Sequence, residues 1–139
     1  MKVLLDTCVL SELNHPHGSH HVRQAVMQIE DDDLFLSVIS IGEIIKGIML
    51  LDDGRRKSAL SHWVQNLIRE FGERILPVDL KTTDRWGQLT AAARKQGLTI
   101  PTSDGLIAST ALCHDLKVMT RNISDFIPAG VGLINPWHD

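Results

Sequence analysis

The chain has 139 residues, with 14 basic and 17 acidic side chains and a formal net charge of −3 at pH 7. Hydrophobic residues make up 43% and charged residues 22%, a balance that excludes a disordered chain. No apolar run reaches the roughly 18–20 residues of a membrane helix, and the acidic balance argues against a uniformly basic nucleic-acid binder. We expect one globular domain over residues 1–139.

The cysteine count and the first residues indicate a reducing compartment. Cys8 and Cys113 are too few for a disulfide scaffold, and neither belongs to a C-x-x-C pair. The N-terminal apolar run is interrupted by Asp6, which is not typical of a signal peptide. We therefore expect a cytoplasmic protein that does not associate with a membrane.

Short apolar runs of β type alternate along the chain with longer stretches of helical spacing. In chain order, the expected elements are a strand over 3–5, a helix over 8–13, a helix capped by Ser19, a strand over 34–39, a helix opened by Ser40, a helix over 60–71 ended by Gly72, a strand over 74–78, a helix closed by Gly97, a helix starting at 101–104, and strands over 116–119 and 131–134. This alternation predicts an α/β protein with a parallel sheet covered on both faces.

Four acidic residues far apart in sequence are expected at one edge of that sheet. In open parallel sheets the functional site lies outside the carboxyl ends of the strands. Asp6, Glu43 and Asp125 follow predicted strands closely, and Asp104 begins the helix that leads into the fourth strand. The topology therefore brings these four carboxylates toward a common place.

Each acid also has a purely structural interpretation. Asp6 could cap the helix that follows it, and Ser40 with Glu43 matches the S-x-x-E capping box. Asp104 stands in a first helical turn, where the helix dipole favours an anion, and Asp125 could cap a turn. Taken one at a time, the structural and functional interpretations are about equally supported.

Taken together, the acids indicate a cation site. Two unit charges about 5 Å apart at an effective dielectric constant near 20 repel by about 3 kcal/mol, so a fold that gathers several carboxylates needs a neutralising ion. Carboxylate oxygens without a histidine or cysteine cluster suit Mg²⁺ or Mn²⁺, and such ions support phosphodiester cleavage. Asp79 also follows a predicted strand, so position alone does not select the ligands.

Four segments in this order resemble one known family. They are residues 4–12, 37–44, 101–108 and 120–126. The chain resembles the PIN domains, and within them the nucleases of the VapC and FitB kind. The resemblance implies a three-layer α/β/α fold with a mainly parallel sheet of about five strands and an acidic pocket for Mg²⁺ or Mn²⁺.

The same resemblance assigns roles to individual residues. The catalytic, metal-binding acids would be Asp6, Glu43, Asp104 and Asp125, with Asp6 and Asp104 as direct ligands and the other two binding directly or through water. Supporting roles, in orienting water or substrate or in holding a carboxylate, fall to Thr7, Thr102 and Asn122. Two basic residues are expected to contact phosphates: Lys46, on the helix face of Glu43, and Arg121, in the Thr-Arg-Asn turn.

The activity implied by the resemblance is that of a metal-dependent endoribonuclease, the toxin of a toxin–antitoxin pair. Its expected partners are an RNA substrate, a cognate antitoxin protein, operator DNA reached only through that antitoxin, and a second copy of the chain in a homodimer. An alternative stays open, in which the fold is a regulatory binding module that acts through a DNA-binding partner and has little nuclease activity. RNA cleavage by the free chain separates the two.

Several other residues are interpreted structurally. The basic run Arg55–Lys57 is read as a solvated helix start, and Trp63 and Trp86 as core residues rather than stacking platforms for bases. A zinc site is rejected for a group of four histidines, because no recognised ligand spacing includes them. These are His15, His17, His20 and His21. The apolar helix from Trp63 to Phe71 is expected to serve the core and also a dimer or antitoxin surface.

Overall fold

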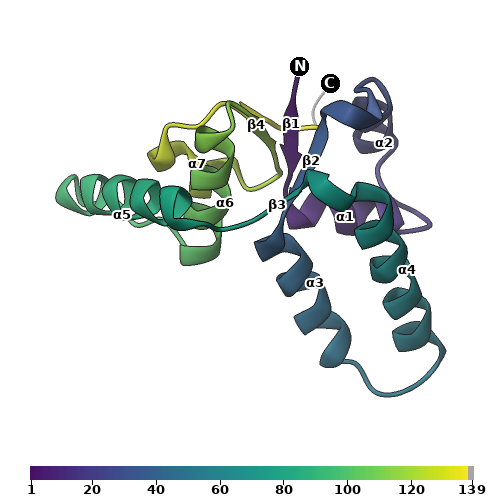
Figure 1. Ribbon diagram of the computed structural model, residues 1–139. Coiled ribbons are helices and arrows are strands. Elements are labelled where there is room, and N and C mark those ends of the chain that lie inside the picture. Colours follow the sequence, from purple (N-terminus) through teal and green to yellow (C-terminus); the bar gives the residue numbers. More distant parts are fainter. Residues whose placement is uncertain (138–139) are drawn as a thin grey trace.

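A five-stranded parallel sheet forms the centre of the protein (Figure 1). The structure is a computed structural model and describes residues 1–137. The strands are β1 Val3–Leu5, β2 Leu34–Ser37, β3 Ile75–Leu76, β4 Lys117–Met119 and β5 Leu133–Ile134. They lie in the order β3-β2-β1-β4-β5, with every neighbouring pair parallel. The predicted fold class, a three-layer α/β/α arrangement, is confirmed.

Helices cover both faces of the sheet, as Figure 1 shows. They are α1 Thr7–Asn14, α2 His20–Met27, α3 Val38–Met49, α4 Arg55–Phe71, α5 Leu80–Lys95, α6 Thr102–Cys113 and α7 Ile123–Phe126, with 3₁₀ turns at Asp31–Asp33, Gly72–Arg74 and Ile127–Ala129. Among residues 1–137, no helix is both long and apolar enough to cross a membrane.

The side chains of the central strand alternate between two cores. Val3 and Leu5 belong to a buried cluster with residues of α1, α2, α3 and α4, whereas Leu4 packs on the opposite face with residues of α6. All three are at most 1% exposed. Since burial of one such side chain is worth about 1.5–3 kcal/mol, both helical layers are firmly held on the sheet.

The second strand is shorter than the sequence predicts. The predicted strand over 34–39 ends at Ser37, and α3 already begins at Val38. Ser37 is the N-cap, because its hydroxyl accepts a hydrogen bond from the Ile39 N–H at 3.0 Å. The β-branched pair Val38 and Ile39 imitates a strand, but the serine cap outweighs that preference. Ser40 therefore does not open the helix and lies buried inside it.

Strand β3 is also shorter than predicted. It covers Ile75–Leu76 at the edge of the sheet, where the sequence predicts a strand over 74–78. Pro77 follows at once and lacks the backbone N–H that a strand ladder needs. The fifth strand, predicted over 131–134, covers Leu133–Ile134.

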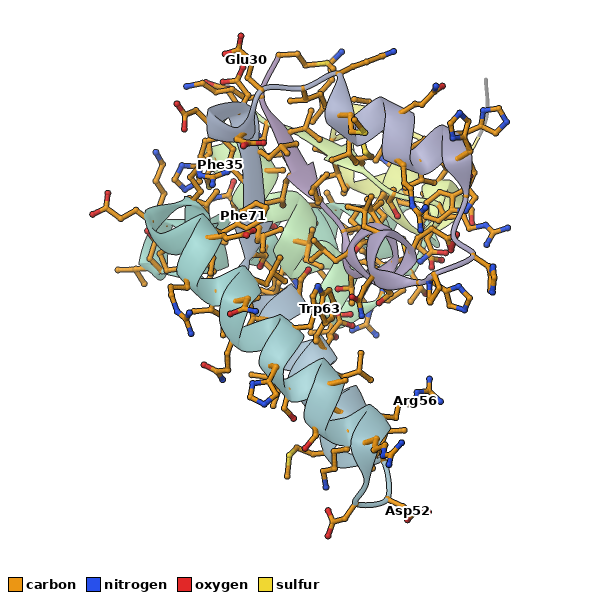
Figure 2. All side chains as sticks on the ribbon, turned by 90° about the vertical axis from the view of Figure 1, so that its right-hand side faces the viewer. Glu30, Phe35, Asp52, Arg56, Trp63 and Phe71 are labelled. Carbon is orange, nitrogen blue, oxygen red and sulfur yellow. The ribbon has the colours of Figure 1, made fainter. Side chains whose placement is uncertain are left out.

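Helices α3 and α4 run side by side and extend beyond the sheet as an arm (residues 38–71) in Figure 1. Ile44 and Ile48 of α3 are buried in the same cluster as Val64 and Leu67 of α4. The helix predicted over 60–71 starts earlier, at Arg55, and ends as expected before Gly72, whose φ is +51°. The start of α4 lies at the free end of this arm (Figure 2).

Candidate active site

The four predicted acids come from four different elements that follow or flank the sheet. Asp6 directly follows β1 and is the N-cap of α1, and Glu43 lies in α3, which follows β2. Asp104 stands in the first turn of α6, and Asp125 in the first turn of α7, after β4. Because the strands are parallel, the chain leaves β1, β2 and β4 at the same edge.

Asp6 is a buried carboxylate held by hydrogen-bond donors. It is 2% exposed. Its Oδ1 accepts from the Thr7 N–H at 2.8 Å, and its Oδ2 accepts from the Thr120 hydroxyl at 2.7 Å. The Cys8 thiol lies 3.6 Å from Oδ2, and burial raises the pKa of that thiol, so it donates as a neutral group. These donors fix the direction of the carboxylate and offset part of its desolvation.

Thr7 connects the first two acids. Its hydroxyl donates to Glu43 Oε1 at 2.7 Å and lies 2.9 Å from the Ser40 hydroxyl. The capping-box interpretation of Ser40 and Glu43 is therefore wrong, because Ser40 is not an N-cap and the Glu43 carboxylate is engaged by α1. Glu43 therefore has no role in a capping box, and its carboxylate instead accepts a hydrogen bond from Thr7, the residue after Asp6.

The negative charges of the other three acids act on Asp104. Burial, followed by the negative charges of Asp6, Asp125 and Glu43, raises its pKa from an ordinary 3.8 to about 6. Such an effect requires the carboxylates to lie near one another with little screening between them. The pKa shift of Asp104 is therefore consistent with four acids at one edge of the sheet.

Asp79, the ambiguous fifth acid, has a structural role. It is the N-cap of α5, and its Oδ1 accepts from the Thr82 N–H and from the Thr82 hydroxyl, both at 2.9 Å. These hydrogen bonds lower its pKa. Asp79 does not contribute to the raised pKa of Asp104, which separates it from the acidic group.

The Thr-Arg-Asn turn is built around a hydroxyl that the sequence analysis missed. Thr120 is fully buried; besides donating to Asp6, it accepts from the Asn122 N–H at 3.0 Å. Asn122 thereby supports the acid through its backbone. The Arg121 N–H donates to the Cys8 sulfur at 3.5 Å. The signal available in the sequence was the place of Thr120 directly after β4, at the edge where Asp6 lies.

The remaining predicted residues are at the surface. Thr102 is the first residue of α6 and is exposed, and within residues 1–137 its side chain makes no hydrogen bond. Lys46 is exposed in the last turn of α3, three residues after Glu43. The Arg121 guanidinium lies over the Trp137 ring, 5.1 Å from its centroid. Thr7 alone of the supporting side chains touches an acid directly.

The donor set at this edge consists of carboxylate and hydroxyl oxygens, the ligands of hard cations. In the described part of the chain, no three His, Cys, Asp or Glu side chains lie close enough to enclose an ion by themselves. An ion held here would therefore be bound by few protein ligands and would keep several waters.

Comparison with known proteins gives a single family. The PIN domain model matches residues 3–126. The chain is 36% identical over 138 residues to the Toxin FitB of Neisseria gonorrhoeae, covering 99% of both chains. It is 32% identical over 136 residues to the VapC ribonuclease Y4jK of Sinorhizobium fredii, covering 97% of both. The chain therefore belongs to the PIN domain family, in the group that includes FitB and VapC.

Solved structures agree with this membership. The chain superimposes on a chain of FitAB bound to an IR36 DNA fragment with a TM-score of 0.93. The two chains are 35% identical, and the match covers 99% of this chain and 96% of the other. The resemblance predicted from the four sequence segments is confirmed.

Proposed function

We propose that the chain is a metal-dependent endoribonuclease that hydrolyses RNA phosphodiester bonds and acts as the toxin of a toxin–antitoxin pair. The observation that supports the proposal is the placement of four acids: Asp6, Glu43 and Asp125 lie on elements that follow β1, β2 and β4, Thr7 beside Asp6 donates to Glu43, and the charges of all three help to raise the pKa of Asp104. The names of the relatives, a toxin and a ribonuclease, support the same activity.

Mg²⁺ or Mn²⁺ fits the donor set as the cofactor. Asp6 and Asp104 would hold it directly, and Glu43 and Asp125 directly or through water. Mg²⁺ commonly binds one or two carboxylates and keeps several waters, which agrees with acids that do not form a closed cage. When bound, the ion supplies an activated water and charge stabilisation for phosphodiester hydrolysis.

The chain's own residues orient this chemistry. Thr120 fixes Asp6, and Thr7 fixes Glu43, so two carboxylates are held in place before substrate arrives. We assign Thr102 and Asn122 to positioning water or substrate at the same edge. Lys46 and Arg121 are assigned to RNA phosphates, Lys46 being an exposed cation without an ion pair in residues 1–137.

The proposed partners follow from the FitAB complex on DNA. A cognate antitoxin would inhibit the chain and provide the contact with operator DNA, which suits a chain whose own net charge is −3. We further propose a homodimer that acts in the cytoplasm as a single-domain protein.

The test compares acid variants in cells and in solution. Wild type induced without a partner is expected to arrest growth and, once purified, to cleave RNA with Mg²⁺ or Mn²⁺. Asp6→Asn and Asp104→Asn each remove a carboxylate charge at nearly constant shape. We expect cleavage to fall by at least about 100-fold, since even outer-shell partners of metal ligands are worth about 10–100-fold.

The matched control is Asp79→Asn, which removes the same charge at a helix start outside the acidic group. It should cleave within about twofold of wild type, because asparagine also serves as an N-cap. Retained cleavage in both acid variants, with folding verified by circular dichroism, contradicts the proposal. Absence of cleavage by wild type, with operator binding only in the presence of a partner, favours the regulatory module instead.

A further inference from the structure

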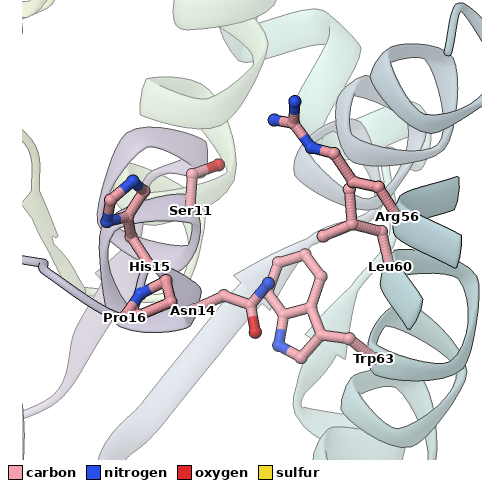
Figure 3. Close-up of a pocket in the computed structure, with 7 residues that line it drawn as sticks. All are labelled: Ser11, Asn14, His15, Pro16, Arg56, Leu60 and Trp63. Atoms are coloured by element: carbon pink, nitrogen blue, oxygen red, sulfur yellow. The ribbon is translucent and has the colours of Figure 1, made fainter.

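A second hollow lies beside the acidic edge, between the end of α1 and the first half of α4. Its volume is about 540 Å³. Figure 3 shows Ser11, Asn14 and His15 on one side, facing Arg56 and Trp63 on the other. In Figure 2, Arg56 lies near the far end of α4 and Trp63 about half-way along it. The hollow therefore extends along the α3–α4 arm from the start of α4 to its middle, and we call it the α1–α4 pocket.

The α1–α4 pocket opens toward the candidate active site. A neighbouring hollow of about 240 Å³ shares Ser11, Arg56 and Trp63 with it and adds Thr7 and Glu43 to its lining. Glu43 is one of the four acids, and Thr7 is the residue that holds it. The two hollows are therefore neighbours, and the α1–α4 pocket lies next to the hollow that Glu43 lines.

One wall of the pocket is fixed by hydrogen bonds. The His15 carbonyl accepts from the Arg23 guanidinium at 2.6 Å, and His15 Nδ1 accepts from the His17 N–H at 3.1 Å. Neutral His15 therefore carries its proton on Nε2, which is left as a donor. Glu12 fastens the following turn by accepting from the Ser19 N–H at 2.6 Å. A wall that is already ordered lowers the cost of binding.

The opposite wall offers a free cation and an aromatic surface. Within residues 1–137, the Arg56 guanidinium makes no hydrogen bond, ion pair or ring contact. The two basic residues adjacent to Arg56 differ from it: Lys57 pairs with Asp53 at 3.1 Å, and Arg55 lines neither the α1–α4 pocket nor the neighbouring hollow. Trp63 is half-buried, so its indole both packs on the core and lines the pocket.

This combination of groups matches a nucleotide. A guanidinium fork binds phosphate in a bidentate manner, an indole stacks on a base, and amide and hydroxyl groups such as those of Asn14 and Ser11 bind base edges. A volume of about 540 Å³ lies in the usual range of small-ligand pockets. A purely apolar occupant would leave the guanidinium and the amide without partners.

We propose that the α1–α4 pocket binds one unpaired nucleotide of the RNA strand next to the scissile phosphate, with Arg56 on a phosphate and Trp63 against the base. The proposal rests on the proposed nuclease function and names how the substrate is held. Arg56 then binds RNA, whereas the sequence alone indicates only a solvated helix start for Arg55–Lys57.

The test uses nucleoside 5′-monophosphates as probes and the side-chain N–H signal of Trp63 in a ¹H–¹⁵N NMR spectrum as readout. Trp63→Phe identifies that signal among the three tryptophans. Titration of wild type with AMP, GMP, CMP and UMP should shift the signal saturably with at least one of them, whereas inorganic phosphate alone should shift it less. Arg56→Gln should weaken binding by at least about tenfold.

Arg55→Gln is the matched control, since it removes the same charge from the adjacent residue in the same helical turn. It should bind nucleotide within about twofold of wild type. In RNA cleavage, Arg56→Gln should raise KM by about tenfold with little change in kcat, because the contact is made before and during reaction alike.

Three results overturn the inference: a Trp63 signal that no nucleotide moves, equal weakening by Arg55→Gln and Arg56→Gln, or an unchanged KM in Arg56→Gln. In the first case a protein segment of the partner would take the place of RNA as the occupant. The nucleotide titration requires no cleavage, so nucleotide binding that persists in a chain without acid-dependent cleavage overturns the proposed function and not the pocket.

Discussion

Two helices of this protein, α5 and α6, each have an aspartate near their start, and the pKa values of the two aspartates shift in opposite directions. Asp79 is the exposed N-cap of α5 and accepts two hydrogen bonds from Thr82, which lower its pKa. Asp104 lies inside the first turn of α6, where partial burial and the charges of Asp6, Asp125 and Glu43 raise its pKa to about 6. The residue type is the same, but the burial and the neighbouring groups differ.

The difference shows how a structural acid is told from a functional one. A carboxylate surrounded by donors stabilises the fold in its charged form. A partly buried carboxylate near other carboxylates is destabilised in its charged form, and such a group is a candidate for a functional site. Asp79 at the start of α5 is a helix cap, whereas we propose that Asp104 at the start of α6 belongs to the cation site.

The largest effect on this comparison is expected in the RNA cleavage rate when the Thr7 hydroxyl is removed. Thr7→Val deletes the donor to Glu43 at nearly constant shape and should lower the RNA cleavage rate by about 10–100-fold, because Glu43 loses its fixed direction. Thr82→Val is the control, since it deletes the hydroxyl donor to Asp79 at the other helix start. Rates measured at saturating Mg²⁺ should fall only for Thr7→Val. A similar loss in both variants would mean that stability, and not the acidic group, controls the rate.

The sequence was sufficient for the parts of the molecule that depend on local pattern. Strand β1 and the helix stop at Gly72 are where the pattern predicts them, because a short apolar run and a glycine that ends a helix are local signals. The start of α3 was mispredicted because Val38 and Ile39 favour a strand. The helix begins at Val38 because the Ser37 hydroxyl caps it.

The candidate acids and the Thr7 hydroxyl could be named from the sequence, whereas the Thr120 hydroxyl could not. The four acids follow from parallel topology and from the family resemblance. Thr120 was missed because its hydrogen bond joins it to Asp6, 114 residues earlier in the chain, and only the register of β4 on β1 brings the two together. Arg56 was read as a solvated residue for a similar reason, because its place beside α1 depends on how the α3–α4 arm packs.

A smaller effect is expected in the pH dependence of stability without metal. The folded pKa of Asp104, about 6, exceeds the ordinary 3.8, so the folded protein binds more protons between these values and its stability falls as pH rises from about 4 through 6. This rise in the pKa of Asp104 corresponds to at most about 3 kcal/mol, and to about 1–2 kcal/mol after solvent screening.

The measurement is urea unfolding in EDTA of wild type and Asp104→Asn at pH 4 and pH 8. The variant should be more stable than wild type at pH 8 and similar to it at pH 4, where Asp104 is protonated. If wild type and Asp104→Asn differ in stability by the same amount at both pH values, the charges of the other acids do not raise the pKa of Asp104. Addition of Mg²⁺ at pH 8 should reverse the order, because the ion binds the wild-type folded state preferentially.

The smallest effect is expected for Asp79, whose contribution to stability changes with pH in the opposite direction to that of Asp104. Its pKa is lowered in the folded protein, so it contributes stability at neutral pH that is lost as pH falls through its folded pKa, below 3.8. Asp79→Ala removes the cap of α5 and should lower the Tm by a few degrees at pH 7 and by less at pH 3. RNA cleavage at a temperature well below the Tm should stay within about twofold of wild type. In metal-free Asp104→Asn, the Tm at pH 7 should rise. If it also rises in Asp79→Ala, both aspartates destabilise the fold in their charged form, and the distinction between the two helix starts is lost.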